Sequence, residues 1–187
     1  MKWEHDRTEG FGKSQGPEGR LRDDPRSVAL KLLAIRQRSV GGMRQRLREK
    51  GFSPTDVARV VAECIAQGLL DDLRFAEDLV AYALARHPVG RRLLLTKLCQ
   101  HSVPAEIADV VLVRLLPPER EADLARSAAK RKLAELRRRG QRPQSAEAVS
   151  RVVRFLLARG FASGVISAVL DELKSGVHYV EEEQLTK

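Results

Sequence analysis

The stretch Gly68-Leu69-Leu70-Asp71-Asp72-Leu73-Arg74-Phe75-Ala76 contains both a helix stop and a helix start. Gly68 follows an apolar run at helical spacing, and glycine readily adopts the left-handed conformation that ends many helices. Asp71 can then accept hydrogen bonds from the first free amides of a new helix. Leu70 and Phe75, placed around that first turn, are spaced as a hydrophobic staple. The stretch therefore predicts a fixed corner between two helices.

Such corners occur in many all-helical proteins, so this one does not by itself identify a function. The adjacent carboxylates of Asp71 and Asp72 could also be taken for a catalytic or metal-binding pair. Their place at a helix start gives a structural explanation, because carboxylates favour the positive end of the helix dipole. We interpret both as caps and leave open that one of them contacts a partner.

The composition favours an all-helical protein with an aliphatic core. Apolar residues make up 43% of the 187 residues and charged residues 32%, but aromatic residues only 4%. No apolar run approaches the length of a membrane span, and the first residues lack the apolar stretch of a signal peptide. We expect a cytoplasmic protein that does not enter a membrane.

A helical pattern repeats three times after residue 26. Three segments place side chains at positions i, i+3, i+4 and i+7, the spacing of a buried helix face, with one polar lapse at Arg114. The sets are Val57, Val60, Val61 and Cys64; Ile107, Val110, Val111 and Arg114; and Ile166, Val169, Leu170 and Leu173. A similar approach precedes each set, at Gly51-Phe52, Ser102-Val103 and Gly160-Phe161.

These repeats predict the fold class: all-α, with three tandem three-helix repeats that form an elongated or curved array. The expected repeats cover residues 27–72, 73–118 and 119–176. Residues 1–26 and 177–187 are expected to be flexible tails, because they carry too few apolar residues to offset the entropy of ordering. A compact nine-helix globule is the structural alternative.

An ordered set of segments resembles the RecX family, the regulatory proteins that act on the RecA recombinase. GLLDDLRFA at 68–76 matches the family's most characteristic segment, and its signature positions are Gly68, Leu70, Asp71, Asp72, Arg74 and Phe75. Arg38-Ser39 and Gly51-Phe52 resemble the first family repeat, Gly90-Arg91-Arg92 the second and Arg159-Gly160-Phe161 the third. The resemblance covers roughly residues 28–175.

The resemblance implies a protein that binds the RecA–single-stranded DNA filament, suppresses its ATPase and strand exchange, and promotes its disassembly. Double-stranded DNA is a further candidate partner, and a monomer is expected. Two segments depart from the family pattern, Gly41-Gly42-Met43 and His101-Ser102-Val103. Because each helical glycine costs about 1 kcal/mol relative to alanine, we expect the helix at 40–50 to start late or fray.

The formal net charge of +9 favours a polyanionic partner. The first 27 residues carry equal numbers of basic and acidic side chains, so the excess lies in the helical body. Two predicted helices present basic side chains that form either a continuous binding strip or an ordinary solvated face. These residues are Arg44, Arg46, Arg48, Arg91, Arg92 and Lys97.

A denser basic cluster follows near residue 130, with Glu135 as the one acid among its cations. Its side chains could neutralise DNA phosphates or an acidic protein patch, with an affinity that falls as salt rises. Few aromatic residues interleave with it, so attraction to the nucleic-acid backbone is favoured over base stacking. The cluster comprises Lys130, Arg131, Lys132, Arg137, Arg138, Arg139 and Arg142.

No recognisable set of catalytic or metal-binding residues accompanies these basic segments. We expect no enzymatic activity and no cofactor, and we interpret Cys64 and Cys99 as buried thiols rather than a disulfide pair. The alternative function is a basic helical nucleic-acid-binding protein of the helix-turn-helix type that acts without recombinase. An enzyme, with Asp71, Asp72 or His101 in its site, is a third possibility.

Overall fold

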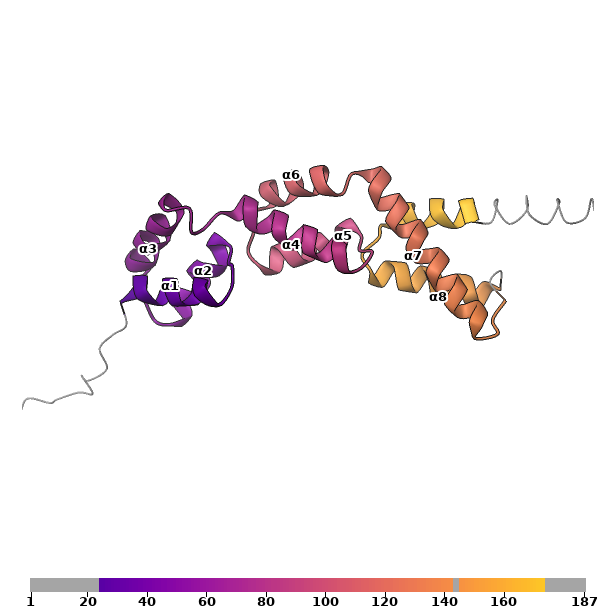
Figure 1. The fold of residues 1–187 in the computed structure, drawn as a ribbon, viewed down its shortest axis with the longest axis horizontal. Helices are drawn as coiled ribbons and strands as arrows, with labels where there is room; N and C mark the ends of the chain where they lie inside the picture. The colour runs from indigo at the N-terminus through magenta and orange to yellow at the C-terminus, as the bar shows by residue number, and fades with distance from the viewer. Residues whose placement is uncertain (1–23, 143–144, 174–187) are drawn as a thin grey trace, which may run out of the picture.

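The computed structural model describes residues 24–142 and 145–173, and every regular element within them is an α-helix. Figure 1 shows three groups of helices that follow one another along the molecule's long axis. The predicted elongated all-helical array is therefore confirmed. In chain order the helices are α1 (Pro25–Ile35), α2 (Val40–Glu49), α3 (Pro54–Ala66), α4 (Asp72–Arg86), α5 (Arg91–Gln100), α6 (Ala105–Leu115), α7 (Pro118–Arg138) and α8 (Ala146–Ala158), and a last helix covers 163–173.

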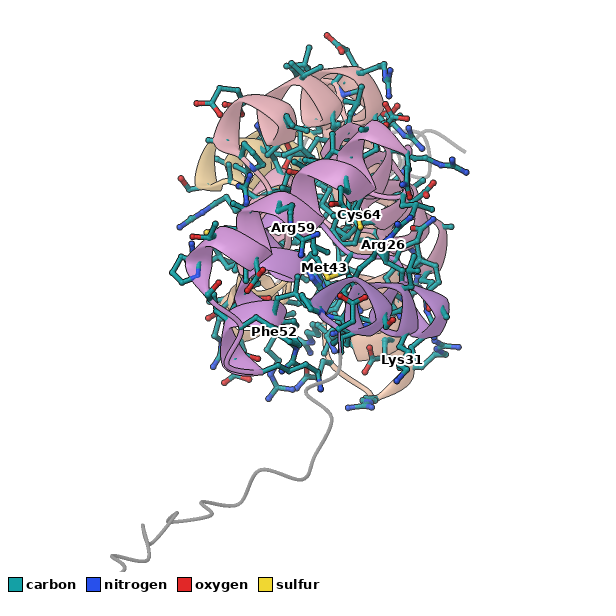
Figure 2. The ribbon with its side chains drawn as sticks, turned by 90° about the vertical axis from the view of Figure 1, so that its left-hand side faces the viewer. Arg26, Lys31, Met43, Phe52, Arg59 and Cys64 are labelled. Carbon is teal, nitrogen blue, oxygen red and sulfur yellow. The ribbon has the colours of Figure 1, made fainter. Side chains whose placement is uncertain are left out.

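Each group of helices encloses its own apolar core. In the first repeat Met43 and Cys64 lie between the helices (Figure 2) and are 0% and 2% exposed. The first core also contains Val28, Ala29, Leu47, Val57, Val60, Val61 and Leu70. The second contains Ala76, Val80, Val89, Leu94, Leu98, Val103, Ala108, Val111, Leu112 and Leu116. The third contains Ala125, Ala128, Ala129, Leu136, Ala148, Val152, Leu156, Phe161, Ile166 and Val169.

The helix starts follow the capping residues in the sequence. Ser53 Oγ accepts a hydrogen bond from the Asp56 amide at 3.1 Å, and Asp71 Oδ1 accepts one from the Arg74 amide at 3.0 Å. Asp24 caps α1 in the same way, so this helix begins before the predicted start at Ser27. The rest of the predicted tails, at 1–23 and 177–187, lies outside the described residues.

The buried face of α6 differs from the prediction by one residue. Val110 was expected to be buried, yet it is 58% exposed, and Arg114 is exposed as well. In all three repeats the first buried residue of the third helix donates its amide to the carbonyl four residues earlier, from Val57 to Ser53, Ala108 to Pro104 and Ile166 to Ala162. Counting four residues from the N-cap therefore finds the first buried residue of α6, Ala108. The buried face that starts there contains no polar residue. The inward residues of α6 are Ala108, Val111, Leu112 and Leu115.

The first two repeats meet where the start of α2 packs on the corner between α5 and α6. Ser39 Oγ donates to the carbonyl oxygen of His101 and accepts from the Gly42 amide at 2.9 Å. A Cβ added to Gly41 would lie 2.5 Å from Cβ of Ser102, so this close approach requires glycine. The expected late start of α2 is therefore wrong, because contacts with the second repeat hold its first turn.

The second and third repeats meet in an equivalent way. The start of α5 packs on the corner between α8 and the last helix, where the Gly90 amide donates to the Arg159 carbonyl at 2.9 Å. The Arg92 amide donates to the Gly160 carbonyl at 3.1 Å. A side chain at Gly90 or Gly160 would collide with the opposite backbone. One mode of packing is thus used at both junctions.

An acidic side chain completes each junction. Asp72, the first residue of α4, accepts a hydrogen bond from the Val40 amide through Oδ1 at 2.8 Å. Glu121, in the first turn of α7, accepts one from the Arg91 amide through Oε1 at 2.8 Å. The second and third repeats therefore each cap the second helix of the repeat before them.

Candidate nucleic-acid interface

An open basic groove of about 670 Å³ lies at the second junction. One face of α7 supplies most of its lining residues, and the rest come from the loop between α4 and α5 and from the end of α8. Because two repeats supply its walls, the junction contacts of Gly90 and Gly160 fix its shape. The residues that line it include Arg131, Lys132, Arg137, Arg138, Phe155 and Arg159, with Glu135 as the acid.

The acid in the groove is already paired. Glu135 accepts from Lys132 Nζ and pairs with Arg139, both at 3.0 Å, and these contacts keep the pKa of its carboxyl below the usual value. Arg131 and Arg137 form no ion pair within 4 Å among the residues that the structure describes. The groove therefore presents a net positive charge to solvent and suits an anionic ligand.

The aromatic ring in the groove holds cations rather than offering a free face. Lys132 Nζ lies 5.6 Å from the centre of the Phe155 ring, and the Arg159 guanidinium lies 5.0 Å from it. Arg159 also donates to the Pro88 carbonyl at 3.4 Å, which ties α8 to the second repeat. Cation–π contacts of this kind position charged side chains. The groove is built to present charges, as phosphate contacts require, rather than a platform for stacked bases.

The predicted basic cluster is divided between this groove and the surface outside it. Arg131, Lys132, Arg137 and Arg138 line the groove. Lys130 does not. Its charge acts on Glu172, whose pKa is lowered mainly by the hydrogen bond from Arg126 and further by Lys130. Arg139 and Arg142 are exposed outside the groove.

The predicted strip on α2 and α5 is partly used for internal contacts. Arg91 pairs with Asp109 at 2.9 Å, and Arg46 pairs with Glu49 at 2.7 Å. Arg44 and Arg48 share one exposed face of α2, beside the first junction. Arg92 and Lys97 are exposed on α5.

Sequence reasoning missed Phe155 and Arg159 as members of the candidate site. Phe155 lies in the last turn of α8, and Arg159 is the C-cap residue four positions later, which is the spacing of neighbours on one helix face. An aromatic residue four positions before a basic one on an amphipathic helix is a local signal for a cation–π pair. That signal does not reveal that α7 lies opposite these two residues. Only the packing of α7 against α8 in the structure shows this.

The signature stretch joins the first two repeats. Leu70 lies in the first core, whereas Phe75 packs against the second, with its ring 5.4 Å from the His101 ring. Asp71 caps α4 as predicted, but Asp72 caps α2 instead of its own helix. Burial raises the pKa of Asp72, although its bond to the Val40 amide opposes the shift.

The described residues show neither a membrane helix nor a metal cluster. None of their helices combines the length and the apolarity needed to span a bilayer. No three His, Cys, Asp or Glu side chains within 24–142 and 145–173 lie close enough together to hold a metal ion. The two thiols differ, since Cys64 is buried but Cys99 is exposed. The prediction for Cys99 is wrong because α5 buries only Leu94 and Leu98.

Comparison with known proteins places this architecture in a family. Residues 26–64 match the model of the RecX first three-helix domain. The chain is 31% identical to regulatory protein RecX of Chlorobium limicola, over 81% of this chain and 91% of the relative. The chain belongs to the RecX family. Regulatory protein RecX of Trichlorobacter lovleyi is 32% identical over 78% of this chain and 92% of its own length.

Solved RecX structures share the fold. The crystal structure of RecX from Lactobacillus salivarius superposes with a TM-score of 0.71, at 18% identity, over 82% of this chain and 96% of that one. A second crystal structure of regulatory protein RecX gives a TM-score of 0.67 at 23% identity, over 80% of this chain and 71% of that one. The three-repeat array is therefore the fold of the family.

Proposed function

We propose that this protein binds the RecA–single-stranded DNA filament and modulates it, mainly by inhibiting its ATPase and strand exchange. Membership of a family of regulatory proteins supports a regulatory role in recombination and DNA repair. The observation that carries the proposal is the basic groove at the second junction, whose free cations suit the phosphates of a nucleic-acid strand. The protein acts in the cytoplasm, as a monomer, without a cofactor or catalysis of its own.

The elongated array suits a filament better than an isolated ligand. A filament presents the same surface at regular intervals, and linked binding units raise the effective concentration of each further contact. Figure 1 shows α2 towards one end of the array and α7 and α8 towards the other. The exposed Arg44 and Arg48 on α2 and the groove beside α7 therefore supply separate contact points. The two junctions fix the spacing between them.

Adding the purified protein to RecA filaments on single-stranded DNA tests this function. We expect ATP hydrolysis and strand exchange to fall as the protein approaches saturation of the filament, and the effect to weaken as salt rises. Unchanged ATPase and strand exchange at modest salt would overturn the proposal. Sequence-selective footprints on duplex DNA without recombinase would favour the helix-turn-helix alternative instead.

A further inference from the structure

The signature stretch lines a second, smaller pocket between the first two repeats. Its volume is about 280 Å³, and its walls come from the end of α1, the loop before α2, the corner between α3 and α4, and the start of α4. Arg38 and Arg74 supply positive charge, and Leu33, Leu69 and Phe75 supply apolar surface. The pocket thus combines two guanidinium groups with an aliphatic and aromatic wall.

Arg38 has no anionic partner in this pocket. Its Nε is buried and has no hydrogen-bond partner among the described residues. Burial lowers the pKa of its guanidinium, and the nearby Arg36 and Arg46 lower it further. Buried polar atoms in native proteins normally have a hydrogen-bond partner, because an unsatisfied buried donor is costly. The free protein therefore holds a guanidinium that an incoming anion would stabilise.

The other charged groups in the pocket do not meet this need. Arg74 is exposed and forms no ion pair within 4 Å in the part of the chain that the structure describes. Asp71 lines the pocket, but its Oδ1 accepts from the Leu73 and Arg74 amides at 2.9 and 3.0 Å. Oδ1 is thus bound to its own helix start, and no ion pair among the described residues joins Asp71 to Arg38 or Arg74. Both arginines are therefore available to one ligand.

We propose that this pocket is a docking site for an acidic segment of a protein partner. A carboxylate would bind the guanidinium groups of Arg38 and Arg74, where Arg offers paired donors in a fixed plane. An adjacent apolar side chain would cover Leu69, which is 44% exposed, and contact Phe75. The inference rests on the proposed function only in that the recombinase is the partner expected to supply this segment.

The apolar wall favours a protein segment over a nucleic-acid strand. A sugar-phosphate backbone offers anions but no aliphatic side chains, and an exposed leucine gains nothing from phosphate. The groove at the second junction differs, because cations cover the ring there. We therefore assign the two sites to different ligands, the groove to phosphates and the signature pocket to carboxylates with apolar neighbours.

A peptide titration of the full chain, without recombinase, tests the pocket. The probes are a blocked peptide that alternates leucine and glutamate, the same peptide with glutamine for glutamate, and oligodeoxythymidine. We expect the glutamate peptide to shift the NMR signals of Arg38 and Arg74 and to bind at least about tenfold more tightly than the glutamine peptide, since the bonds are charge-assisted. Equal binding of the two peptides, or displacement of the glutamate peptide from these arginines by the oligonucleotide, would overturn the assignment.

Substitution of Arg38 separates docking from a structural role. Arg38→Met should weaken binding of the glutamate peptide at least about tenfold. It should leave the melting temperature of the free chain equal or higher, because it removes a buried Nε that has no hydrogen-bond partner. Arg151→Met, which changes an exposed arginine on α8 far from the pocket, is the matched control and should leave peptide binding unchanged.

A lower melting temperature for Arg38→Met, or unchanged peptide binding, would show that Arg38 is not a docking residue. Arg74→Gln is a second variant, at an exposed position, and it too should weaken binding of the glutamate peptide. These measurements use no filament, so their failure leaves the proposed regulation of RecA standing. Inhibition of the RecA filament is measured in a separate experiment, which tests the proposed function and not the pocket.

Discussion

The carboxylate of Asp72, at the start of the second repeat, accepts a hydrogen bond from the backbone amide of Val40 in the first repeat at 2.8 Å. Glu121 makes the equivalent bond to the Arg91 amide, from the third repeat to the second. Helix starts have unsatisfied amides, and here the next repeat along the chain satisfies one of them. The hydrogen bond therefore stabilises the start of a helix in one repeat only when the next repeat is docked against it.

Removing this acceptor should loosen the first junction. We expect Asp72→Ala to destabilise the start of α2 by about 1 kcal/mol, the typical cost of a lost helix cap. Asp72→Asn should cost less, because the amide oxygen can still accept from Val40 and burial no longer opposes a charge. Hydrogen exchange of the 39–50 segment measures both. Equal exchange in Asp72→Ala and the wild type would contradict the role of this bond.

Gly41 should be more important for the junction than for its helix. Alanine normally favours a helix by up to about 1 kcal/mol over glycine, but a Cβ at Gly41 would overlap Ser102. Gly41→Ala should therefore lower the melting temperature and increase exchange at both sides of the first junction. The control is Gly164→Ala, in the last helix, where no atom lies within 4 Å of the added Cβ. That variant should be neutral or stabilising, and equal effects of the two would contradict the packing argument.

Acidification should weaken the first junction through His101. Burial lowers the pKa of this imidazole below 6.5, and Arg36 and Lys97 lower it further. Although the residue is exposed as a whole, its ring packs against the Phe75 ring in a T-shaped arrangement. The unfolded chain therefore binds the proton more tightly, so the free energy of unfolding should fall as the pH drops through 6.5 towards the folded-state pKa.

Urea denaturation between pH 7.5 and 5.5 measures this dependence. We expect His101→Asn to flatten the curve over this range, because asparagine does not titrate there. His87→Asn, at an exposed position, should keep the dependence of the wild type. An unchanged slope in His101→Asn would show that another group is responsible.

The sequence predicted the repeats well because their causes are local. Ser53 and Asp71 cap the helices that follow them, and apolar spacing marks the buried faces. The one-residue error in α6 arose where Val110 and Val111 are both apolar, so that spacing alone did not separate them. Counting from Pro104, the N-cap residue, identifies Val111 as the buried one of the two.

The junctions and the candidate site could not be predicted in the same way, because they depend on residues far apart in the chain. Glycine in a helix reads locally as a weak point, and the partner of Gly41 lies at Ser102. Likewise, the basic cluster gave the charge of the groove but not its far wall, where Phe155 and Arg159 face α7. The composition shows that basic residues are abundant. Only the packed structure shows which of them have no ion-pair partner among the described residues.

The central claim is tested most directly by measuring how binding of the protein to RecA filaments depends on salt concentration. The groove variant for this test carries both Arg131→Gln and Arg138→Gln. Arg151→Gln with Arg154→Gln is the matched control, since it removes the same charge from exposed α8 positions outside the groove. We predict that the groove variant loses ATPase inhibition and that its salt slope falls by about 0.7 for each lost contact to single-stranded DNA, while the control retains both. Equal behaviour of the two variants would contradict the assignment of the groove as the nucleic-acid interface.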